Sequence, residues 1–298
     1  MVSSQTIIQS LVTGTQHDSK LEVTNLNNAK QSLIANEGEH LGQNVIQVSP
    51  ITDKGNIQFT AIYTNLKDWS YQGKPITKLK YDIRLKANYL SGYANASDKY
   101  GFNIQLSQDP TKGFNLNGYS MEYDITMFYA DGTPVNFGEG DAYITAGSLN
   151  NYTNMTGWQK GDLGAVDITD PNAPGSYKAE WHGYSIETAT PLSGGKALTL
   201  VGSTVSNHGG TLYANEPNTY KTILGGNVDG SWDENGSGKQ YLGAGLIRLS
   251  GEKTTLRFNT ISDGIKPGYV YRNYMWGNLT AVIPETPATN INYHYNVA

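Results

Sequence analysis

The sequence contains no cysteine, which excludes disulfide bonds, thiolate metal sites and cysteine nucleophiles. A chain without cysteine is ordinary on the surface of Gram-positive bacteria, where no dedicated compartment forms disulfides, and also in the cytosol. Charged residues are scarce too, at 16%, and the formal net charge is -5 at pH 7. The chain as a whole therefore does not attract nucleic acid, and a site for a polyanion has to be a local patch.

Long apolar runs are also missing. No window approaches the ~18 apolar residues that cross a bilayer, so we expect no membrane insertion. No nucleophile elbow, phosphate loop or zinc-protease helix occurs, and the five histidines lack the spacing of metal ligands. These absences argue against an enzyme and favour a binding protein.

Glycine and tyrosine are abundant, with 34 and 21 copies among 298 residues. This composition is typical of short strands joined by turn-rich loops and predicts an all-β protein. We expect one domain over residues 1–283, in which residues 1–50 form an entry segment that wraps the core. The Pro-Glu-Thr-Pro run within residues 284–298 predicts a linker toward a following stalk domain.

We expect the rest of the chain to be organised around residues 56–87, where apolar and polar residues alternate in two runs joined by a turn. Strict alternation predicts strands with one buried and one solvated face. The expected inward rows are Ile57, Phe59, Ala61, Tyr63 and Leu79, Tyr81, Ile83, Leu85. A similar row in residues 119–129, followed by an Asp-Gly turn, predicts a hairpin with residues 133–137.

The second run places four cations on its outward face, namely Lys78, Lys80, Arg84 and Lys86. Exposed lysines commonly protect a sheet edge from aggregation, which is one interpretation of this row. The other is a strip that binds a phosphate polymer such as nucleic acid or a teichoic acid. The residues alone leave both open.

Two pairs of carboxylates invite functional hypotheses. Glu139 and Asp141 follow a strand and are candidates to hold a structural divalent cation, Ca²⁺ or Mg²⁺, with an ordinary surface loop as the alternative. Glu180 and Glu187 flank aromatic residues, as the acid pair of a glycoside hydrolase does, but the sequence does not give their separation. The hydrolase is therefore the remote alternative.

Five segments, in this order, resemble one known family: YTNLKDWSYQGKPITKLKYDI, DPTKGFNLNG, FYADGTPVNFGEGDAYITAGSLNN, GSTVSNHGGTLYANEPNTYK and QYLGAGLIRL. They are similar to the variable-region adhesin domain shared by streptococcal antigen I/II proteins and glucan-binding protein C. Within that family the chain is most similar to the adhesin domain of enterococcal aggregation substance.

The resemblance implies a lectin-like β-supersandwich, two large antiparallel sheets with loop and short helical excursions, and no catalysis. It implies a cell-wall-anchored surface protein of a Gram-positive bacterium that often holds a divalent cation. The implied ligands are lipoteichoic acid and extracellular DNA, with roles in cell aggregation, biofilm formation, virulence and conjugative plasmid transfer. Relatives that bind glucan or host glycoproteins supply the alternative.

The family's loop positions also imply where a ligand would bind. They correspond here to polar and aromatic residues that we expect around one cleft, because hydroxyl, amide and aromatic groups can bond to or stack on a polymer. The candidates are Ser148, Asn150, Asn151, Ser206, Asn207, His208, Trp232 and Tyr241.

Overall fold

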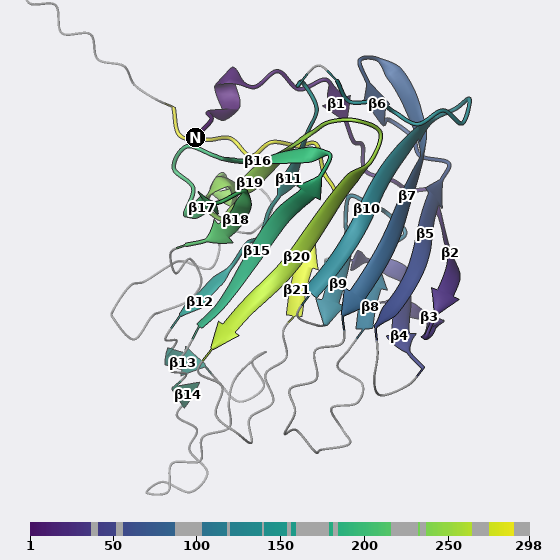
Figure 1. The fold of residues 1–298 in the computed structure, drawn as a ribbon, viewed down its shortest axis with the longest axis horizontal. Helices are drawn as coiled ribbons and strands as arrows, with labels where there is room; N and C mark the ends of the chain where they lie inside the picture. The colour runs from purple at the N-terminus through teal and green to yellow at the C-terminus, as the bar shows by residue number, and fades with distance from the viewer. Residues whose placement is uncertain are drawn as a thin grey trace, which may run out of the picture.

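The structure is a computed structural model, in which antiparallel β-strands dominate (Figure 1). It describes residues 1–36, 41–51, 56–86, 103–117, 120–138, 140–153, 156–158, 179–180, 184–215, 232, 237–263 and 274–288. The two largest sheets have eleven and five strands and lie face to face. This arrangement confirms the all-β prediction.

The eleven-stranded sheet forms the front layer in Figure 1. Its main body has the order β2-β5-β7-β10-β20-β15-β18-β17, while β6 and then β1 continue beside the first residues of β7, and β12 pairs with the start of β15. The strands are β1 (Leu11–Val12), β2 (Lys20–Asn27), β5 (Ile57–Thr64), β6 (Ser70–Tyr71), β7 (Lys74–Lys86), β10 (Ser120–Tyr129), β12 (Asn151–Thr153), β15 (Tyr184–Ser193), β17 (Val205–His208), β18 (Thr211–Ala214) and β20 (Thr254–Asp263).

The five-stranded sheet lies behind it in the order β21-β9-β8-β4-β3. These strands are β3 (Ala29–Asn36), β4 (Gln43–Pro50), β8 (Asn103–Leu106), β9 (Phe114–Asn117) and β21 (Tyr274–Gly277). Phe114 joins the two layers, because its ring packs edge-on against Tyr123 of β10 and Phe258 of β20 at centroid distances of 6.0 and 5.8 Å. Such aromatic contacts add to the stabilisation from burial alone.

Smaller elements complete the described fold. A three-stranded sheet has the order β11-β19-β16, and β13 pairs with β14. Their bounds, with those of two 3-10 helices, are β11 (Tyr143–Ala146), β13 (Thr156–Trp158), β14 (Ala179–Glu180), β16 (Gly195–Thr199), β19 (Gly245–Leu249), η1 (Ser4–Thr6) and η4 (Gln240–Gly243).

The alternating rows predicted for β5 and β7 are confirmed. The eight side chains expected to face inward are all buried, and none of them is more than 5% exposed. The Asp-Gly turn is also present: Asp131 accepts hydrogen bonds from the backbone N–H and the hydroxyl of Thr133. The returning chain, however, contacts β10 through a single bridge, Phe128 to Pro134, and does not form a full strand.

The two ends of the described chain are hydrogen-bonded to each other. Thr286 is buried, and it exchanges hydrogen bonds with Ser4 through N–H to hydroxyl contacts of 3.0 and 2.9 Å in the two directions. Residues 1–50, predicted as an entry segment, contribute β1 to β4 to the two main sheets. Residues 284–288 of the predicted linker pack against the domain, and residues 289–298 lie outside the described part.

Candidate functional site

The outward row of β7 lies on the solvated face of the eleven-stranded sheet, as predicted. Lys78, Lys80 and Arg84 are partly exposed, while the residues between Lys78 and Arg84 that face inward are buried. The side chain of Lys86, the fourth predicted cation, lies outside the described residues. Strand pairing places Arg84 opposite Glu122 and Asp82 opposite Asp124, so that β10 brings carboxylates directly beside the cations.

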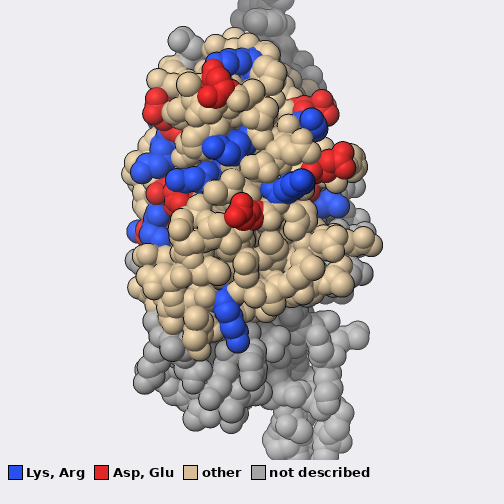
Figure 2. Space-filling view, turned by 90° about the vertical axis from the view of Figure 1, so that its right-hand side faces the viewer, with Lys and Arg blue, Asp and Glu red and all other residues tan. Residues whose placement is uncertain are grey.

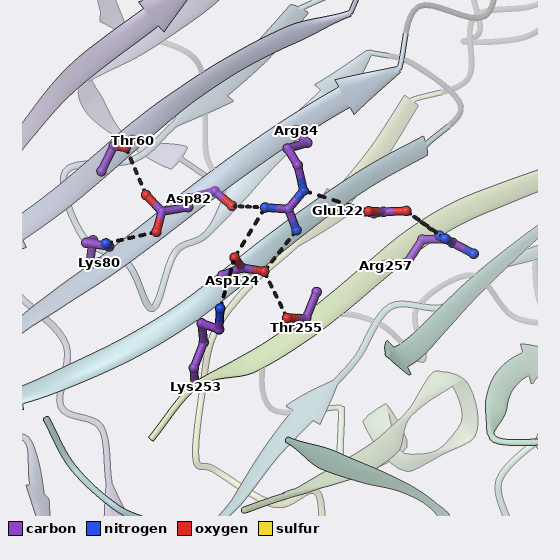
Figure 3. Close-up of polar contacts among 9 residues, drawn as sticks. All are labelled: Thr60, Lys80, Asp82, Arg84, Glu122, Asp124, Lys253, Thr255 and Arg257. Atoms are coloured by element: carbon purple, nitrogen blue, oxygen red, sulfur yellow. Dashed lines mark hydrogen bonds and ion pairs between the residues drawn. The ribbon is translucent and has the colours of Figure 1, made fainter. Parts of the chain in front are cut away.

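Lys80 is paired within its own strand. Its ammonium lies 2.9 Å from the Asp82 carboxylate, whose other oxygen accepts a hydrogen bond of 2.9 Å from the Thr60 hydroxyl on β5 (Figure 3). Both charged side chains are about one-third exposed, at 36% and 35%. Because water screens such a pair, it contributes little stability but does reduce the local positive field.

Arg84 lies at the centre of the network in Figure 3. Its guanidinium donates to both oxygens of Asp124, at 2.9 and 3.3 Å, and its Nε lies 3.8 Å from Glu122. Glu122 in turn accepts a 2.6 Å hydrogen bond from Arg257 of β20. The forked guanidinium suits this two-oxygen contact, which fixes the side chain more firmly than a single ion pair.

Asp124 has two more partners. Besides Arg84, it accepts a 2.9 Å hydrogen bond from the Thr255 hydroxyl and has the Lys253 ammonium at 3.8 Å. Partial burial raises the pKa of Asp124, but the hydrogen bonds from Arg84 and Thr255 and the nearby cations outweigh this and lower it below the ordinary value. The hydrogen bond to Asp124 correspondingly raises the pKa of Arg84.

Lys78 has a different environment. Its ammonium lies 4.1 Å from the centre of the Phe128 ring, and it forms no ion pair with a carboxylate of the described residues. Together with Lys78, the described residues that these contacts link hold five cations against three carboxylates, a surplus of two positive charges, in the set Lys78, Lys80, Asp82, Arg84, Glu122, Asp124, Lys253 and Arg257. We call these eight residues the charged face.

The sequence indicated only some of the partners of the predicted cations. Asp82 stands in the same outward row as the predicted cations and could have been included. Glu122, Asp124 and Arg257 occupy alternate positions on other strands, but only the pairing of β7 with β10 and of β10 with β20 brings them to Arg84. A view from the side of β2 and β5 likewise shows positive and negative side chains interspersed (Figure 2).

The predicted cleft residues fall into a buried group and an exposed group. Ser148 and Asn151 are buried, and the Asn151 amide donates to the Ala214 carbonyl of β18 at 2.6 Å. Asn150 donates from its backbone N–H to the Glu187 carboxylate at 2.8 Å. Glu187 itself is only 3% exposed, so this carboxylate holds a turn in place in the interior.

Trp232 belongs to the buried group. Its side chain is 1% exposed, and its ring lies directly on Gly243 of η4, where an added Cβ would approach the ring to 2.1 Å. Gly243 accepts a backbone hydrogen bond from Leu149, which connects this tryptophan to the Ser148–Asn151 segment. Stacking on a ligand would require the ring to leave this packing.

The exposed or partly exposed group lies on the β17–β18 hairpin and in η4. His208 stacks on Tyr213 at a centroid distance of 4.8 Å, and its Nε2 lies 2.7 Å from the Ser206 hydroxyl. The Asn207 amide donates to the Ala197 carbonyl at 3.0 Å, and Tyr241 is partly exposed. The β17–β18 pairing and the Asn151 bond to Ala214 bring both groups into one region. Ligand binding by these residues stays a prediction.

Of the predicted cation ligands, Glu139 lies outside the described residues. The Asp141 oxygens accept hydrogen bonds from the Tyr71 hydroxyl at 2.8 Å and the Gln72 amide at 3.1 Å. Desolvation raises the pKa of Asp141, yet the hydrogen bonds, including one from Ser10, lower it overall. Within the described part of the chain no three His, Asp or Glu side chains gather as metal ligands, and the cation site stays a prediction.

The packed antiparallel sheets define the protein as a β-supersandwich. A family model described as glucan-binding protein C matches residues 2–280. The chain therefore belongs to the glucan-binding protein C family, and the resemblance predicted from the five sequence segments is confirmed. It is an adhesin domain of this type, a class that acts in cell adhesion.

Solved structures share the fold at low sequence identity. The glucan-binding protein C of Streptococcus mutans is 18% identical with a TM-score of 0.59, over 93% of this chain and 78% of that one. The DNA-bound adhesin domain of PrgB from Enterococcus faecalis is 16% identical with a TM-score of 0.61, over 94% of this chain and 97% of that one. The same domain without DNA is 15% identical with a TM-score of 0.60, over 92% of this chain and 90% of that one.

No helix in the described part of this chain is long and apolar enough to span a membrane.

Proposed function

We propose that this domain is a non-catalytic adhesin module that binds an extended anionic polymer, with lipoteichoic acid and extracellular DNA as the expected ligands. The observation that carries the proposal is the surplus of positive charge on the charged face of a chain whose net charge is -5. The DNA-bound relative supports the ligand class, because it has the same fold. As part of a wall-anchored surface protein, such a module promotes cell aggregation, biofilm formation and conjugative plasmid transfer.

Within the charged face the two lysines least neutralised by carboxylates are the best candidates for phosphate contacts. Among the described residues, Lys78 has an aromatic ring and no carboxylate beside its ammonium, and Lys253 is 58% exposed with its carboxylate partner at 3.8 Å. Arg84 contacts two carboxylates, Glu122 and Asp124, so it orders the charged face and is less available for a phosphate contact. Phosphate binding at such lysines releases counterions and therefore weakens with salt.

The test is binding of fluorescent double-stranded DNA and of lipoteichoic acid across a salt series. The double variant Lys78→Gln/Lys253→Gln removes the two candidates, while Lys30→Gln/Lys239→Gln removes two exposed lysines elsewhere with the same change in net charge. For duplex DNA we expect the slope of log K against log salt to fall by about 2 in the first variant only, since each phosphate contact contributes roughly 0.9.

A gain of binding provides a second arm. Asp82→Asn removes a carboxylate from the centre of the charged face and leaves Lys80 without its 2.9 Å partner. The substitution should tighten DNA binding several-fold at low salt, because a repulsive charge disappears and a cation becomes available. Equal affinities for the unmodified protein and the three variants would reject the charged face as the site. No binding of DNA or lipoteichoic acid even at low salt would reject the polyanion proposal itself.

A neutral glucan is the second candidate ligand, favoured by the family to which the chain belongs and by the stack of exposed His208 on partly buried Tyr213 beside Ser206. Glucan binding depends on hydrogen bonds and stacking, so it should change little with salt and should weaken in Tyr213→Ala. Saturable binding of a purified host glycoprotein would instead indicate a protein-binding adhesin. Release of reducing ends from dextran would indicate a glycoside hydrolase.

A further inference from the structure

Sheet edges expose unpaired backbone groups, and proteins usually protect them with short strands, bulges, charges or covering segments. Most edges of the described sheets follow this rule. β17 and β21 have four residues each, and β11 is covered by the segment at Thr280, whose carbonyl accepts from Thr145. β2 is interrupted by a register shift between Thr24 and Asn27, with Asn25 in the left-handed region at φ 52°.

Among the described residues, β3 has the least of this protection. It is eight residues long, it runs beside β4 with no register shift, and β4 is its only hydrogen-bonded strand neighbour among the described residues. It contains no proline and a single charged residue, Lys30. It lies at the right-hand edge of the molecule in Figure 1, next to β2.

The side chains of β3 are also unusually exposed for a strand within a sandwich. Those of residues 30–33 and 35 are exposed, and Leu33 is 67% exposed. Figure 2, which looks onto this edge of the molecule, shows most charged side chains in the upper part of the described surface and few below. A long, regular, weakly charged edge strand with an exposed leucine at its middle is a template for pairing with another strand.

We propose that β3 pairs antiparallel with β3 of a second copy of this chain, around a two-fold axis centred on Leu33. In this register Leu33 lies opposite its own counterpart, Ser32 opposite Ile34 and Gln31 opposite Ala35. The two copies of Lys30 lie at opposite ends of the pair, so no like charges face each other. The two five-stranded sheets then join into one continuous ten-stranded sheet with an isologous interface.

The pairing contributes both backbone hydrogen bonds and apolar contact. The two exposed Leu33 side chains lie on the same face of the joined sheet and cover each other, which removes apolar surface from water. One pair of strands buries less than the roughly 800 Å² per partner of a standard stable interface, so the dimer is weak and reversible. Many copies displayed on facing surfaces would multiply this weak contact through avidity.

The interface is separate from the proposed ligand surface. β3 belongs to the five-stranded sheet, whereas the charged face lies on β7, β10, β20 and the turn before β20 of the other sheet. Self-association therefore does not depend on the identity of the polymer. It gives the domain a way to join copies of itself in the absence of any ligand.

The lack of native cysteine makes a direct test possible, because a single introduced cysteine forms disulfides only between copies. Leu33→Cys should cross-link rapidly under mild oxidation with diamide, since its counterpart lies directly opposite. Ser32→Cys is a matched control on the same strand, where the two sulfurs lie too far apart for a disulfide in the proposed register. Leu26→Cys on β2 is a control on the neighbouring edge, with the side chain 36% exposed.

Sedimentation of the unmodified protein over a wide concentration range provides the second measurement. We expect a reversible monomer–dimer equilibrium with a dissociation constant in the range of about 10 µM to 1 mM, given the small interface. Leu33→Lys places two cations opposite each other and should abolish it, while Leu26→Lys should leave it unchanged. Cross-linking at equal rates for all three cysteine variants, a monomer at every concentration, or a dimer that survives Leu33→Lys would overturn the proposal.

Discussion

The residue with the most connections on the charged face is Asp124, and its lowered pKa has a defined consequence for stability. A carboxyl group whose pKa is lower in the folded than in the unfolded protein contributes stability above its unfolded pKa of about 3.9. That contribution is lost as the pH falls through the folded value. Hydrogen bonds from Arg84 and Thr255 lower this pKa, so the ionised Asp124 stabilises the fold at neutral pH and this stabilisation is absent in strong acid.

We therefore predict that Asp124→Asn lowers the free energy of unfolding by about 1–3 kcal/mol at pH 7, the usual range for a lost charged hydrogen bond. The difference from the unmodified protein should stay constant between about pH 5 and pH 8 and shrink below about pH 4. Urea unfolding followed by tryptophan fluorescence at several pH values measures it. Asp18→Asn, at an exposed position, is the control, and a difference independent of pH down to pH 2 would contradict the assignment.

Two glycines with the same backbone conformation allow strain to be separated from close packing. Gly113 and Gly132 have φ of +79° and +83°. A Cβ on Gly113 would lie 1.8 Å from the Gly277 carbonyl oxygen, whereas nothing lies within 4 Å of a Cβ on Gly132. Gly132→Ala should cost about 1–2 kcal/mol of unfolding free energy from the left-handed conformation alone.

Gly113→Ala should cost several kcal/mol in total, because β9 and β21 have to move apart as well. Chemical denaturation of the two variants gives the comparison. Equal losses would show that the backbones at Gly113 and Gly277 separate easily, and would weaken the assignment of β21 as a firmly paired edge strand.

At the scale of elements, the side chain of Gln9 links both described end segments of the chain to the three-stranded sheet. The Gln9 amide nitrogen donates to the carbonyls of Tyr143 and Ala281, both at 2.8 Å, and its oxygen accepts from the Tyr143 N–H at 3.0 Å. The side chain thus replaces a backbone partner at the edge of β11. Loss of these bonds leaves partly buried backbone groups unpaired.

We predict that Gln9→Ala increases hydrogen exchange in residues 2–12 and 279–286 by one to two orders of magnitude, with little change in β7 or β10. The reason is that this side chain adds to only a few other hydrogen bonds that attach the two segments, such as those at Val2, Ser10 and Thr145, whereas the central strands have continuous ladders. Gln58→Ala, at an exposed position of β5, is the control and should change neither region. Uniform acceleration across the domain would instead mean that the attachment is part of the global unfolding unit.

The alternating strands β5, β7 and β10 were predictable, because each has one buried and one solvated face and the period-2 pattern records that difference. β2 and β3 were not recognised as strands. The side chains of β3 are exposed on both faces, so the sequence AKQSLIAN has no alternation to detect. A strand of this kind is specified by its neighbours in the sheet and not by its own pattern.

The same distinction applies to the candidate site. The cations of β7 were predicted from one strand, but their neutralisation by Glu122 and Asp124 depends on the register between β7 and β10, which the sequence of neither strand specifies. Trp232 was a reasonable stacking residue by type, and its burial against Gly243 follows from tertiary packing alone. Residue types thus predicted which side chains could bind a ligand, while strand register and packing determined which of them remain accessible.

For the whole molecule, the hydrogen bonds between the described ends have a topological consequence. Ser4 and Thr286 exchange two hydrogen bonds, and the Gln5 amide donates to the Thr286 carbonyl at 3.0 Å. A short linker can therefore connect residues 2 and 288 without disturbing the sheets. The exposed turn at Asp131 and Gly132, with no close contact at the glycine, offers a place for new ends.

We predict that a circular permutant which begins at Gly132 and ends at Asp131, with residues 2 and 288 joined by about six Gly and Ser residues, folds to the same sheets. The new ends interrupt only the turn after β10, so unfolding should remain cooperative, with a loss of about 1–2 kcal/mol for the broken turn. Circular dichroism and urea unfolding measure both. A permutant opened instead within β7, between Lys80 and Tyr81, should fail to fold, because β7 is hydrogen-bonded to β5 on one side and β10 on the other. Failure of both permutants would show that the sheets require the native chain connection through residues 131–132.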